Sequence, residues 1–300
     1  MKVLVPDDLG MRMLGSSPPV VPVRYTAGAP WPEEHLDAEA VVVDFTEAPA
    51  TGRRLGDLPH LRLVQTLHAG YEQWLPWVPD DVLLSNGRGA HGGSTAEWVV
   101  AALLDIYREL PLFRRQQSAA QWRQKYTDTL IGKKVVVLGA GDLGVNLAAR
   151  LTPFEATVTL VGRHARSGVA AMSEVHALLP EADVVVSMLP DNPSTRHTVD
   201  AGFLAAMRDG AIVVNAGRGG AVDTDALLSE LQSGRLRAAL DVTDPEPLPA
   251  DHPLWEAPGL LLTPHVAGST AGSLQRAWSV AREQISIFAA GGRPPNVVQR

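Results

Sequence analysis

A run of apolar residues leads directly into a glycine-rich turn near the middle of the chain. Residues 133–138 read Lys-Lys-Val-Val-Val-Leu, and the spacing G-x-G-x-x-G follows them. The apolar run predicts a buried strand, and residues 143–151 have the apolar spacing of a helix. Strand, glycine turn and helix in this order bind the pyrophosphate of a dinucleotide, because glycines allow close approach and the helix N-terminus attracts anions. The residues expected beside such a cofactor are Gly139, Gly141, Asp142, Leu143 and Gly144.

Downstream of that turn, apolar runs and helical spacing continue to alternate, which predicts a doubly wound parallel α/β sheet. Residues 244–258 hold five prolines and predict an extended, stiff loop. The expected strands are Thr157–Val161, Asp183–Met188, Ala211–Asn215, Ala238–Val242 and Leu260–Leu262, and a further helix is expected at Thr224–Gly234.

The first third of the chain carries a second set of short apolar runs, separated by turns rich in Pro and Gly. This pattern predicts parallel strands joined by crossovers, at Met1–Val5, Ala40–Val43 and Leu61–Thr66. A helix is expected over Ala96–Leu110, and a last helix over Ser269–Ala290 that packs back on the first third. The 300 residues fit about two domains of ~150 residues each.

Basic residues follow the second strand of the predicted dinucleotide unit. An NAD-binding unit has an Asp or Glu about 20 residues beyond its glycines, where it binds the ribose 2′-hydroxyl. Here the sequence is Gly-Arg-His-Ala-Arg, and Arg163, with His164 and Arg166 beside it, suits the 2′-phosphate of NADP(H). A solvated basic loop is the alternative. Asp142 is expected to offer its N–H to the phosphates and to point its carboxylate to solvent.

The overall composition excludes several other classes of protein. Asp and Glu number 33 against 26 Lys and Arg, and a net charge of -7 has the wrong sign for non-specific binding to nucleic acid or an anionic membrane. The chain has no cysteine, which excludes disulfides, thiolate metal ligands and cysteine nucleophiles, and no metal site is expected. No apolar run reaches the ~18 residues of a membrane span, so we expect a cytoplasmic protein.

Three later segments carry polar residues at the ends of expected strands. They read Asn-Ala-Gly-Arg-Gly-Gly from residue 215, Asp-Val-Thr-Asp-Pro-Glu-Pro from 241 and Thr-Pro-His-Val-Ala-Gly from 263. In order and spacing they resemble the signatures of the D-isomer-specific 2-hydroxyacid dehydrogenase family. Residues 65–71, 86–97 and 187–199 resemble the substrate loop, the hinge segment and the proline loop of that family.

The resemblance implies a two-domain α/β fold in which a Rossmann-type cofactor domain is inserted into a discontinuous substrate domain, with the active site in the cleft between them. The expected bounds are 1–95 with 269–300 for the substrate domain and 96–268 for the dinucleotide-binding domain. The resemblance also implies a homodimer, formed by the helix Ala96–Leu110 and the arm Phe113–Leu130, which includes Trp122.

The catalytic Arg, Glu and His of the family fall on Arg218, Glu246 and His265. These residue types suit the reduction of a small 2-oxo acid to a D-2-hydroxy acid with NADPH. An Arg guanidinium binds the substrate carboxylate bidentately and polarises the adjacent carbonyl. A His gives a proton to the developing alkoxide, and a carboxylate at its far ring nitrogen fixes the tautomer. The resemblance also places Thr95, Pro190, Ala216, Asp241, His265 and Gly268 close to the cofactor.

Residues 67–71 resemble the loop whose backbone N–H groups hold the substrate carboxylate, so Ala69, Gly70 and Tyr71 join Arg218 as expected substrate-binding residues. Tyr71 and Trp74 either line the pocket or belong to the structure. His68 is a second candidate proton donor, ranked below His265 because the sequence shows no carboxylate partner for it. The histidines expected to be structural or on the surface are His91 and His197.

One departure from the family narrows the substrate. Asp44 lies where phosphoglycerate dehydrogenases of the family commonly place an Arg, and its charge would repel a substrate phosphate. The sequence therefore favours unphosphorylated acids and leaves glyoxylate, hydroxypyruvate, pyruvate and larger 2-oxo acids open. Two other functions remain as alternatives: a dinucleotide-sensing protein without enzymatic activity, and a phosphite- or formate-type dehydrogenase on the same fold.

Overall fold

The computed structural model describes residues 1–17 and 19–298 and divides into two compact units. Unit 1 comprises Met1–His91 and Ala271–Arg300, and unit 2 comprises Gly92–Thr270. The sequence placed the two domain boundaries after residues 95 and 268, whereas the units divide after residues 91 and 270. Residues 299–300 of the expected substrate domain lie outside the described part. One α/β unit is thus inserted into a second, discontinuous one, which is the expected fold class.

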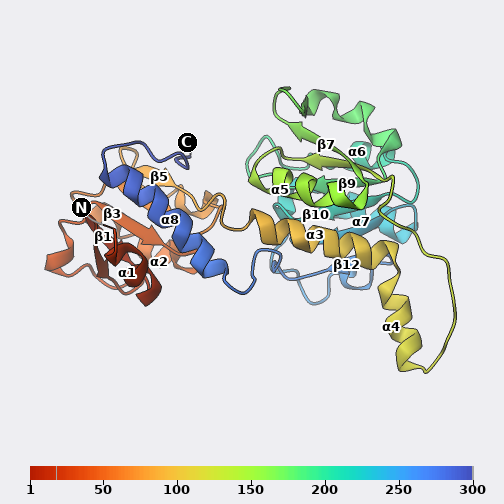
Figure 1. Ribbon diagram of the computed structural model, residues 1–300, viewed down its shortest axis with the longest axis horizontal. Coiled ribbons are helices and arrows are strands. Elements are labelled where there is room, and N and C mark those ends of the chain that lie inside the picture. Colours follow the sequence, from red (N-terminus) through yellow and green to blue (C-terminus); the bar gives the residue numbers. More distant parts are fainter. Residues whose placement is uncertain (18, 299–300) are drawn as a thin grey trace. The chain divides into compact units, whose positions relative to one another are not determined.

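Unit 1 is built on a parallel sheet with the strand order β2-β1-β3-β4-β5 (Figure 1). Alternate residues of β1 enter different apolar clusters, Val3 and Val5 on one side of the sheet and Leu4 on the other. The strands are β1 (Lys2–Val5), β2 (Val21–Arg24), β3 (Ala40–Val43), β4 (Leu63–Thr66) and β5 (Leu83–Ser85), and the helices are α1 (Asp8–Gly15), α2 (Ala48–Gly52) and α8 (Ser273–Ala289).

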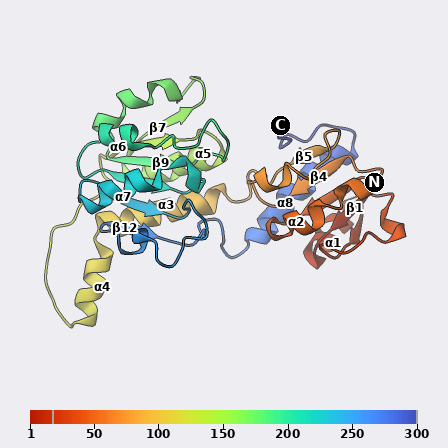
Figure 2. The same cartoon turned by 180° about the vertical axis from the view of Figure 1, so that it is seen from behind.

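Helices from opposite ends of the chain pack together in unit 1, as the expected return of the last helix requires (Figure 2). Trp278 of α8 is fully buried, and a Cβ on Gly10 of α1 would lie 2.4 Å from its ring. The Asp7 carboxylate caps α1 by accepting a hydrogen bond from the Gly10 N–H at 2.7 Å and accepts a second from Trp278 Nε1 at 3.0 Å. Helix α8 begins at Ser273, four residues later than expected, after Gly272 with φ 75°.

Unit 2 contains the predicted alternation of strands and helices on a parallel sheet with the order β12-β11-β10-β9-β6-β7-β8 (Figure 1). The strands are β6 (Lys134–Leu138), β7 (Thr157–Gly162), β8 (Val169–Ala171), β9 (Val184–Ser187), β10 (Ile212–Asn215), β11 (Arg237–Leu240) and β12 (Leu260–Leu262). The helices are α3 (Gly92–Tyr107), α4 (Leu110–Ser118), α5 (Asp142–Leu151), α6 (Ala201–Ala206) and α7 (Thr224–Gln232).

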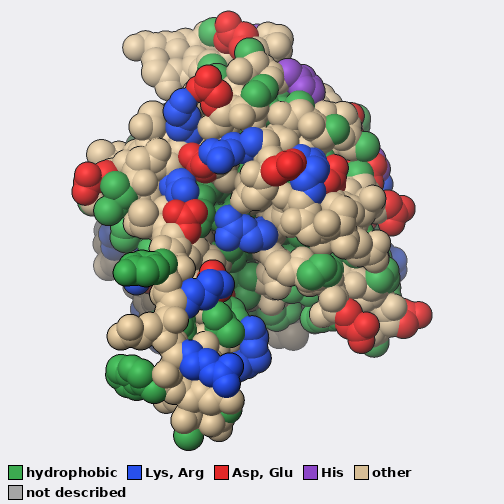
Figure 3. All heavy atoms as spheres, turned by 90° about the vertical axis from the view of Figure 1, so that its right-hand side faces the viewer, with side chains coloured by type: hydrophobic (Ala, Val, Ile, Leu, Met, Phe, Trp, Pro, Cys, Tyr) green, Lys and Arg blue, Asp and Glu red, His purple; other side chains and the backbone are tan. Residues whose placement is uncertain are grey.

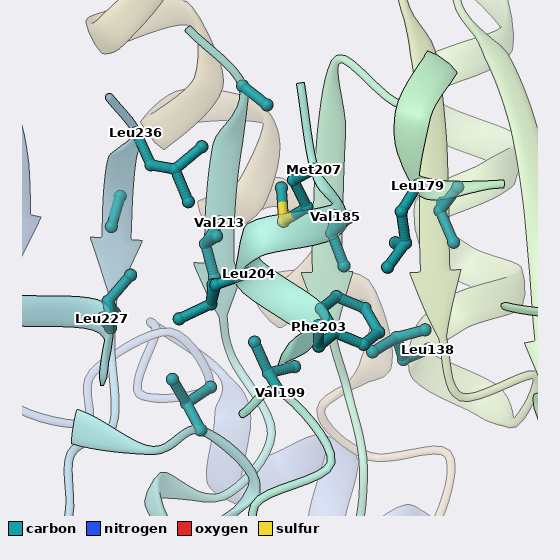
Figure 4. Packing of buried hydrophobic residues seen from close by; sticks show 14 of the residues in the cluster. Leu138, Leu179, Val185, Val199, Phe203, Leu204, Met207, Val213, Leu227 and Leu236 are labelled. Atoms are coloured by element: carbon teal, nitrogen blue, oxygen red, sulfur yellow. The ribbon is translucent and has the colours of Figure 1, made fainter. Parts of the chain in front are cut away.

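Both faces of this sheet are covered by apolar side chains. On β9, Val184 and Val186 join one buried cluster and Val185 joins the other. Figure 4 shows the second cluster, in which Phe203 and Leu204 of α6 pack with Val185 and with residues of neighbouring strands. Strands buried on both faces read as continuous apolar runs, which is why the centre of this sheet was recognisable from the sequence.

Helix α3 starts at Gly92, four residues earlier than expected, and its first two residues are glycines that pack closely against α5. A Cβ on Gly92 would lie 2.0 Å from Asp142 Oδ2, and one on Gly93 would lie 3.0 Å from Arg150 Nη2, both on α5. Helix α3 ends at Tyr107 rather than at the expected Leu110, and Pro111 belongs to the next helix. It lies in the first turn of α4, after Glu109 with a left-handed φ of 48°.

The segment that follows α4 projects from unit 2 and exposes large aromatic side chains. Trp122 is 94% exposed and Tyr126 is fully exposed. Figure 3 faces the end of unit 2 that carries this segment and shows hydrophobic side chains alternating with Lys and Arg there. Within residues 1–17 and 19–298, no helix combines the length and apolar character needed to cross a membrane.

Candidate active site

The glycine turn joins β6 to α5 with the geometry that the fingerprint predicts. Gly139 has φ 117°, and a Cβ there would lie 2.7 Å from Met188 O of the neighbouring chain segment. A Cβ on Gly144 would lie 2.0 Å from Gly139 O, so only glycine lets the helix approach the turn. Space around Gly141 is open, and this residue is the N-cap of α5 and provides no side-chain hydrogen bond to the helix. Uncapped N–H groups at the end of a helix fit a pyrophosphate.

Asp142 differs from the expectation in where its carboxylate points. Its Oδ1 accepts a hydrogen bond from Asn146 Nδ2 at 3.0 Å, and its Oδ2 is buried against the first turn of α3 rather than directed to solvent. The prediction was wrong because the sequence does not show that the glycine-containing first turn of α3 packs against Asp142. The carboxylate is therefore turned toward α3 and Gly92.

The basic turn after β7 lies beside the glycine turn, because β6 and β7 are paired neighbours and end at the same sheet edge. Arg166 Nη2 donates a hydrogen bond to Ala140 O at 2.8 Å, which links the two turns directly. Arg163 and His164 are exposed in the same turn. The structure thus brings these basic side chains together with the glycine turn.

Arg218 follows β10 in a tightly packed loop. Asn215 Nδ2 donates to Arg218 O at 2.9 Å, and its Oδ1 accepts from Gly217 N at 3.2 Å. A Cβ on Gly219 would lie 1.9 Å from Thr243 O, so the loop after β11 rests against the Arg218 loop. Arg218 is half-buried, and its Nη1 donates to Gly217 O at 2.9 Å.

Asp241 follows β11 and holds the segment that carries His265. Its carboxylate, 3% exposed, accepts hydrogen bonds from Thr263 Oγ1 at 2.7 Å, Val266 N at 2.8 Å and Ala267 N at 2.9 Å. Its backbone O accepts from His265 N at 2.7 Å. His265 has a left-handed φ of 54°, an unusual conformation for a non-glycine residue, and these bonds fix it.

Glu246 and His265 form a hydrogen-bonded pair. His265 Nδ1 donates to Glu246 Oε1 at 2.5 Å, and the two side chains are 41% and 39% exposed. Because the carboxylate only accepts, Nδ1 carries the hydrogen and Nε2 is left to exchange a proton with a ligand. Arg218, Glu246 and His265 thus follow three adjacent strands, β10, β11 and β12, at one sheet edge.

The remaining residues expected near the cofactor occupy segments of unit 2 at or beyond strand ends. Pro190 follows β9, and its O accepts a hydrogen bond from Thr195 Oγ1 at 2.7 Å. Ala216 is buried directly after β10, and Gly268 lies just after the Asp241-bound segment. Thr95 is buried within α3. Asn215 and Thr263 were missed, although an amide and a hydroxyl at strand ends are a usable signal.

In unit 1, the expected substrate loop follows β4 and is held by its neighbours. His68 O accepts from Gly87 N at 2.7 Å, and Ala69 O accepts from Asn86 Nδ2 at 2.8 Å. Tyr71 is half-buried, and burial raises the pKa of its phenol. Trp74 is fully buried in an apolar cluster, so it belongs to the core.

His68 has a carboxylate partner, contrary to the expectation. Its Nε2 donates to Asp44 Oδ1 at 2.7 Å, and its ring stacks on that of His91 at 5.3 Å between centroids. The prediction was wrong because the pair is created by strand register: Val43 of β3 pairs with Thr66 of β4, which places the residues that follow side by side. His197 lies 4.0 Å from Asp223 and is 43% exposed.

Comparison with known proteins agrees with this arrangement. Residues 100–267 match the model of the D-isomer specific 2-hydroxyacid dehydrogenase NAD binding domain, so the chain belongs to that family and carries the NAD-binding domain of these dehydrogenases.

Three relatives illustrate the range of the family. D-3-phosphoglycerate dehydrogenase of Mycobacterium leprae is 36% identical over 72% of this chain, and the match spans 42% of that longer protein. A D-isomer specific 2-hydroxyacid dehydrogenase of Xanthobacter autotrophicus, solved with NADPH and MES, is 27% identical with a TM-score of 0.86 over 99% of this chain and 98% of its own. The NADPH-dependent glyoxylate/hydroxypyruvate reductase of Sinorhizobium meliloti, solved with NADP and sulfate, is 26% identical with a TM-score of 0.81 over the same shares.

Proposed function

We propose that this protein reduces a small unphosphorylated 2-oxo acid to the D-2-hydroxy acid, with NADPH as the preferred cofactor, and catalyses the reverse reaction. The observation that carries the proposal is the Glu246–His265 pair at 2.5 Å, on the strand ends next to Arg218. A proton donor beside an anion-binding guanidinium is what the reduction of a 2-oxo acid requires.

The residues divide the work as follows. Arg218 binds the substrate carboxylate and polarises the carbonyl, and the N–H groups of Ala69 and Gly70 in the substrate loop are the further donors to the carboxylate. The Tyr71 N–H already donates to Glu72 Oε2 at 2.9 Å, so the backbone of Tyr71 is not one of these donors. His265 Nε2 gives its proton to the oxygen on which negative charge develops, and Glu246 stabilises the imidazolium and holds its tautomer. When bound, the cofactor supplies a hydride, and Gly139, Gly141, Asp142, Leu143 and Gly144 are the residues that would hold its pyrophosphate.

The preference for NADPH rests on the basic turn after β7. Arg163 and His164 are exposed there, and Arg166 already bonds to the glycine turn through Ala140 O. No acidic side chain stands in that turn to bind a ribose 2′-hydroxyl. Two of the similar solved structures hold NADPH or NADP, which supports this choice.

The substrate class rests on Asp44 and on the similarity to a glyoxylate/hydroxypyruvate reductase. The hydrogen bond from His68 lowers the pKa of the Asp44 carboxyl, so a negative charge stands beside the substrate loop at neutral pH. A phosphorylated acid would be repelled. Because phosphoglycerate dehydrogenases are also relatives, 3-phosphohydroxypyruvate must be included in the assay, and a preference for it would contradict this part of the proposal.

Steady-state kinetics of two variants test the mechanism. Arg218→Ala should raise KM and lower kcat, because the guanidinium acts on both the ground state and the transition state. His265→Asn should leave NADPH binding, measured by fluorescence titration, nearly unchanged while kcat falls by ~10²–10⁴. If His265→Asn keeps the kcat of the parent enzyme, His265 is not the proton donor. If the parent enzyme turns over no 2-oxo acid, the proposed enzymatic function is refuted.

We also propose a homodimer. The projecting segment after α4 exposes Trp122 and Tyr126, and aromatic side chains as exposed as these are typical of interfaces. Light scattering should give twice the 32.0 kDa chain mass, and Trp122→Ser combined with Tyr126→Ser should return the monomer mass. A monomer in the unmodified protein at all concentrations would refute the dimer.

A further inference from the structure

His68 leaves the backbone from a point that its surroundings fix. Its carbonyl O accepts hydrogen bonds from Gly87 N at 2.7 Å and from Thr66 Oγ1 at 2.6 Å. A Cβ on Gly87 would lie 2.5 Å from Leu67 O, so the segment that follows β5 packs directly against the substrate loop. The backbone before Ala69 and Gly70 therefore has little freedom to move.

The imidazole ring of His68 is held as firmly as its backbone. The ring of Phe45 meets it edge-on at 5.7 Å and 72°, and the ring of His91 stacks on it at 5.3 Å and 11°. The His68 side chain nevertheless stays 40% exposed. An immobilised, partly open ring next to a ligand-binding loop is suited to recognising a ligand group.

Asp44 determines which ring nitrogen of His68 carries hydrogen. Its Oδ1 accepts from Phe45 N at 2.6 Å and from His68 Nε2 at 2.7 Å. The bond from His68 lowers the pKa of Asp44, so the carboxylate is ionised and can only accept. Nε2 therefore carries a hydrogen, and Nδ1 is the ring nitrogen that remains for a ligand. Among the residues that the structure describes, no hydrogen bond to this Nδ1 is found.

The charge around the ring selects the kind of group that Nδ1 can bind. Asp44 is negative, and Glu47 is close enough for its pKa to be raised by burial and by the Asp44 charge. A second carboxylate or a phosphate on the substrate would be repelled by the Asp44 carboxylate. A hydroxyl group on the substrate is neutral and can both donate and accept a hydrogen bond, so it can pair with Nδ1.

We propose that His68 is a specificity-determining residue that selects 2-oxo acids with a hydroxyl group on C3, through a hydrogen bond between that hydroxyl and Nδ1. Asp44 is a positioning residue that acts through His68, because it engages Nε2 and leaves Nδ1 for the substrate. The inference rests on the proposed function and deepens it, because it ranks the small acids that the sequence leaves open.

The test compares hydroxypyruvate with pyruvate, which differ by this hydroxyl alone. The readout is the ratio of kcat/KM for the two acids with NADPH, because effects on folding or on cofactor binding cancel in it. The parent enzyme should favour hydroxypyruvate by about tenfold, the scale of one hydrogen bond. His68→Leu should bring the ratio close to one, and His68→Asn should keep part of it, because its amide oxygen replaces Nδ1.

Variants of Asp44 separate the effect of its hydrogen bond to His68 from the effect of its negative charge. Asp44→Asn should keep most of the ratio, since its Oδ1 can still accept from His68 Nε2, whereas Asp44→Leu should lose most of it. His60→Leu is the matched control, because His60 is exposed before β4, whereas His68 follows that strand. It should leave the ratio unchanged.

Two results would overturn the inference while leaving the proposed function intact: a ratio that stays the same in both His68→Leu and Asp44→Leu, or a parent enzyme that prefers pyruvate. If either leucine variant fails to fold, His68→Asn and Asp44→Asn decide instead. A hydroxypyruvate to pyruvate ratio that falls to one in Asp44→Asn would contradict the inference. So would an unchanged ratio in His68→Asn together with a lower rate for both acids. If the parent enzyme reduces no 2-oxo acid, the proposed function and the inference fail together.

Discussion

Replacing Asp241 by Ala should destabilise unit 2 and release the segment that carries His265. The substitution removes the acceptors of three hydrogen bonds, from Thr263 Oγ1, Val266 N and Ala267 N at 2.7, 2.8 and 2.9 Å. Hydrogen bonds to a charged group contribute about 1.5–3 kcal/mol each, and two of these donors are backbone N–H groups.

The losses do not add in full. The Thr263 hydroxyl can turn to another acceptor, and relaxation of His265 from its left-handed conformation returns about 1 kcal/mol. We therefore expect the free energy of unfolding to fall by about 3–5 kcal/mol, as for breaking a buried charged network from one side. Thr263→Val, which removes one of the three bonds, should cost about 1–2 kcal/mol.

Urea unfolding of the cofactor-free protein measures this effect without any contribution from cofactor contacts of Asp241. Fluorescence and circular dichroism should be followed together, because a two-unit chain need not unfold in one transition. The kcat of Asp241→Ala for a 2-oxo acid should fall along with stability, since Glu246 would lose a fixed partner. A loss below 1 kcal/mol in Asp241→Ala would refute the anchoring role.

Three further perturbations give separate outcomes. Arg163→Asp should reverse or strongly reduce the NADPH to NADH ratio of kcat/KM, since a phosphate contact of ~1.5–3 kcal/mol becomes repulsion, and equal use of both cofactors by the parent would contradict the assignment. Glu246→Gln should lower kcat for 2-oxo acid reduction and leave NADPH binding nearly unchanged, because a neutral amide stabilises the imidazolium less than a carboxylate does, and an unchanged kcat would disprove the role of the pair. The pKa of Asp44 is lowered by folding from 3.8, so its contribution to stability is complete above about pH 5 and is lost as pH falls through its folded value. The difference in free energy of unfolding between the parent and Asp44→Asn should therefore shrink below pH 4. A difference that grows below pH 4 would contradict the lowered pKa of Asp44.

The sequence predicted the parts of the fold whose signal is local. Strand β6 and the glycine turn were placed because an apolar run and bare glycines report their own structure. Strands β2, β5 and β8 and the helices α1, α2, α4 and α6 were missed. The three strands lie at sheet edges, where short segments with partly exposed residues lack a continuous apolar run.

Site residues, too, were predictable where the signal is local and not where it depends on packing between distant segments. The Glu246–His265 pair was expected and is present, because both residues lie in recognisable segments after strands. The Asp44–His68 pair was not expected, since it depends on how β3 and β4 align, and alignment between strands is not written in either segment alone. The buried carboxylate of Asp142 depends likewise on which helix packs against it.

The discontinuity of unit 1 has a consequence for synthesis on the ribosome. Its sheet is completed by the end of the chain: α8 buries Trp278, and Val297 bridges to Ser85 of β5. All of unit 2, about 180 residues, must be translated in between, which takes about 10–40 s at usual rates. During that interval the nascent β1, β3 and β4 lack the helix that covers Val3 and Leu63. Unit 2 can therefore fold first, while the earlier-made half of unit 1 waits with apolar surface exposed and is the part of the nascent chain most in need of a chaperone.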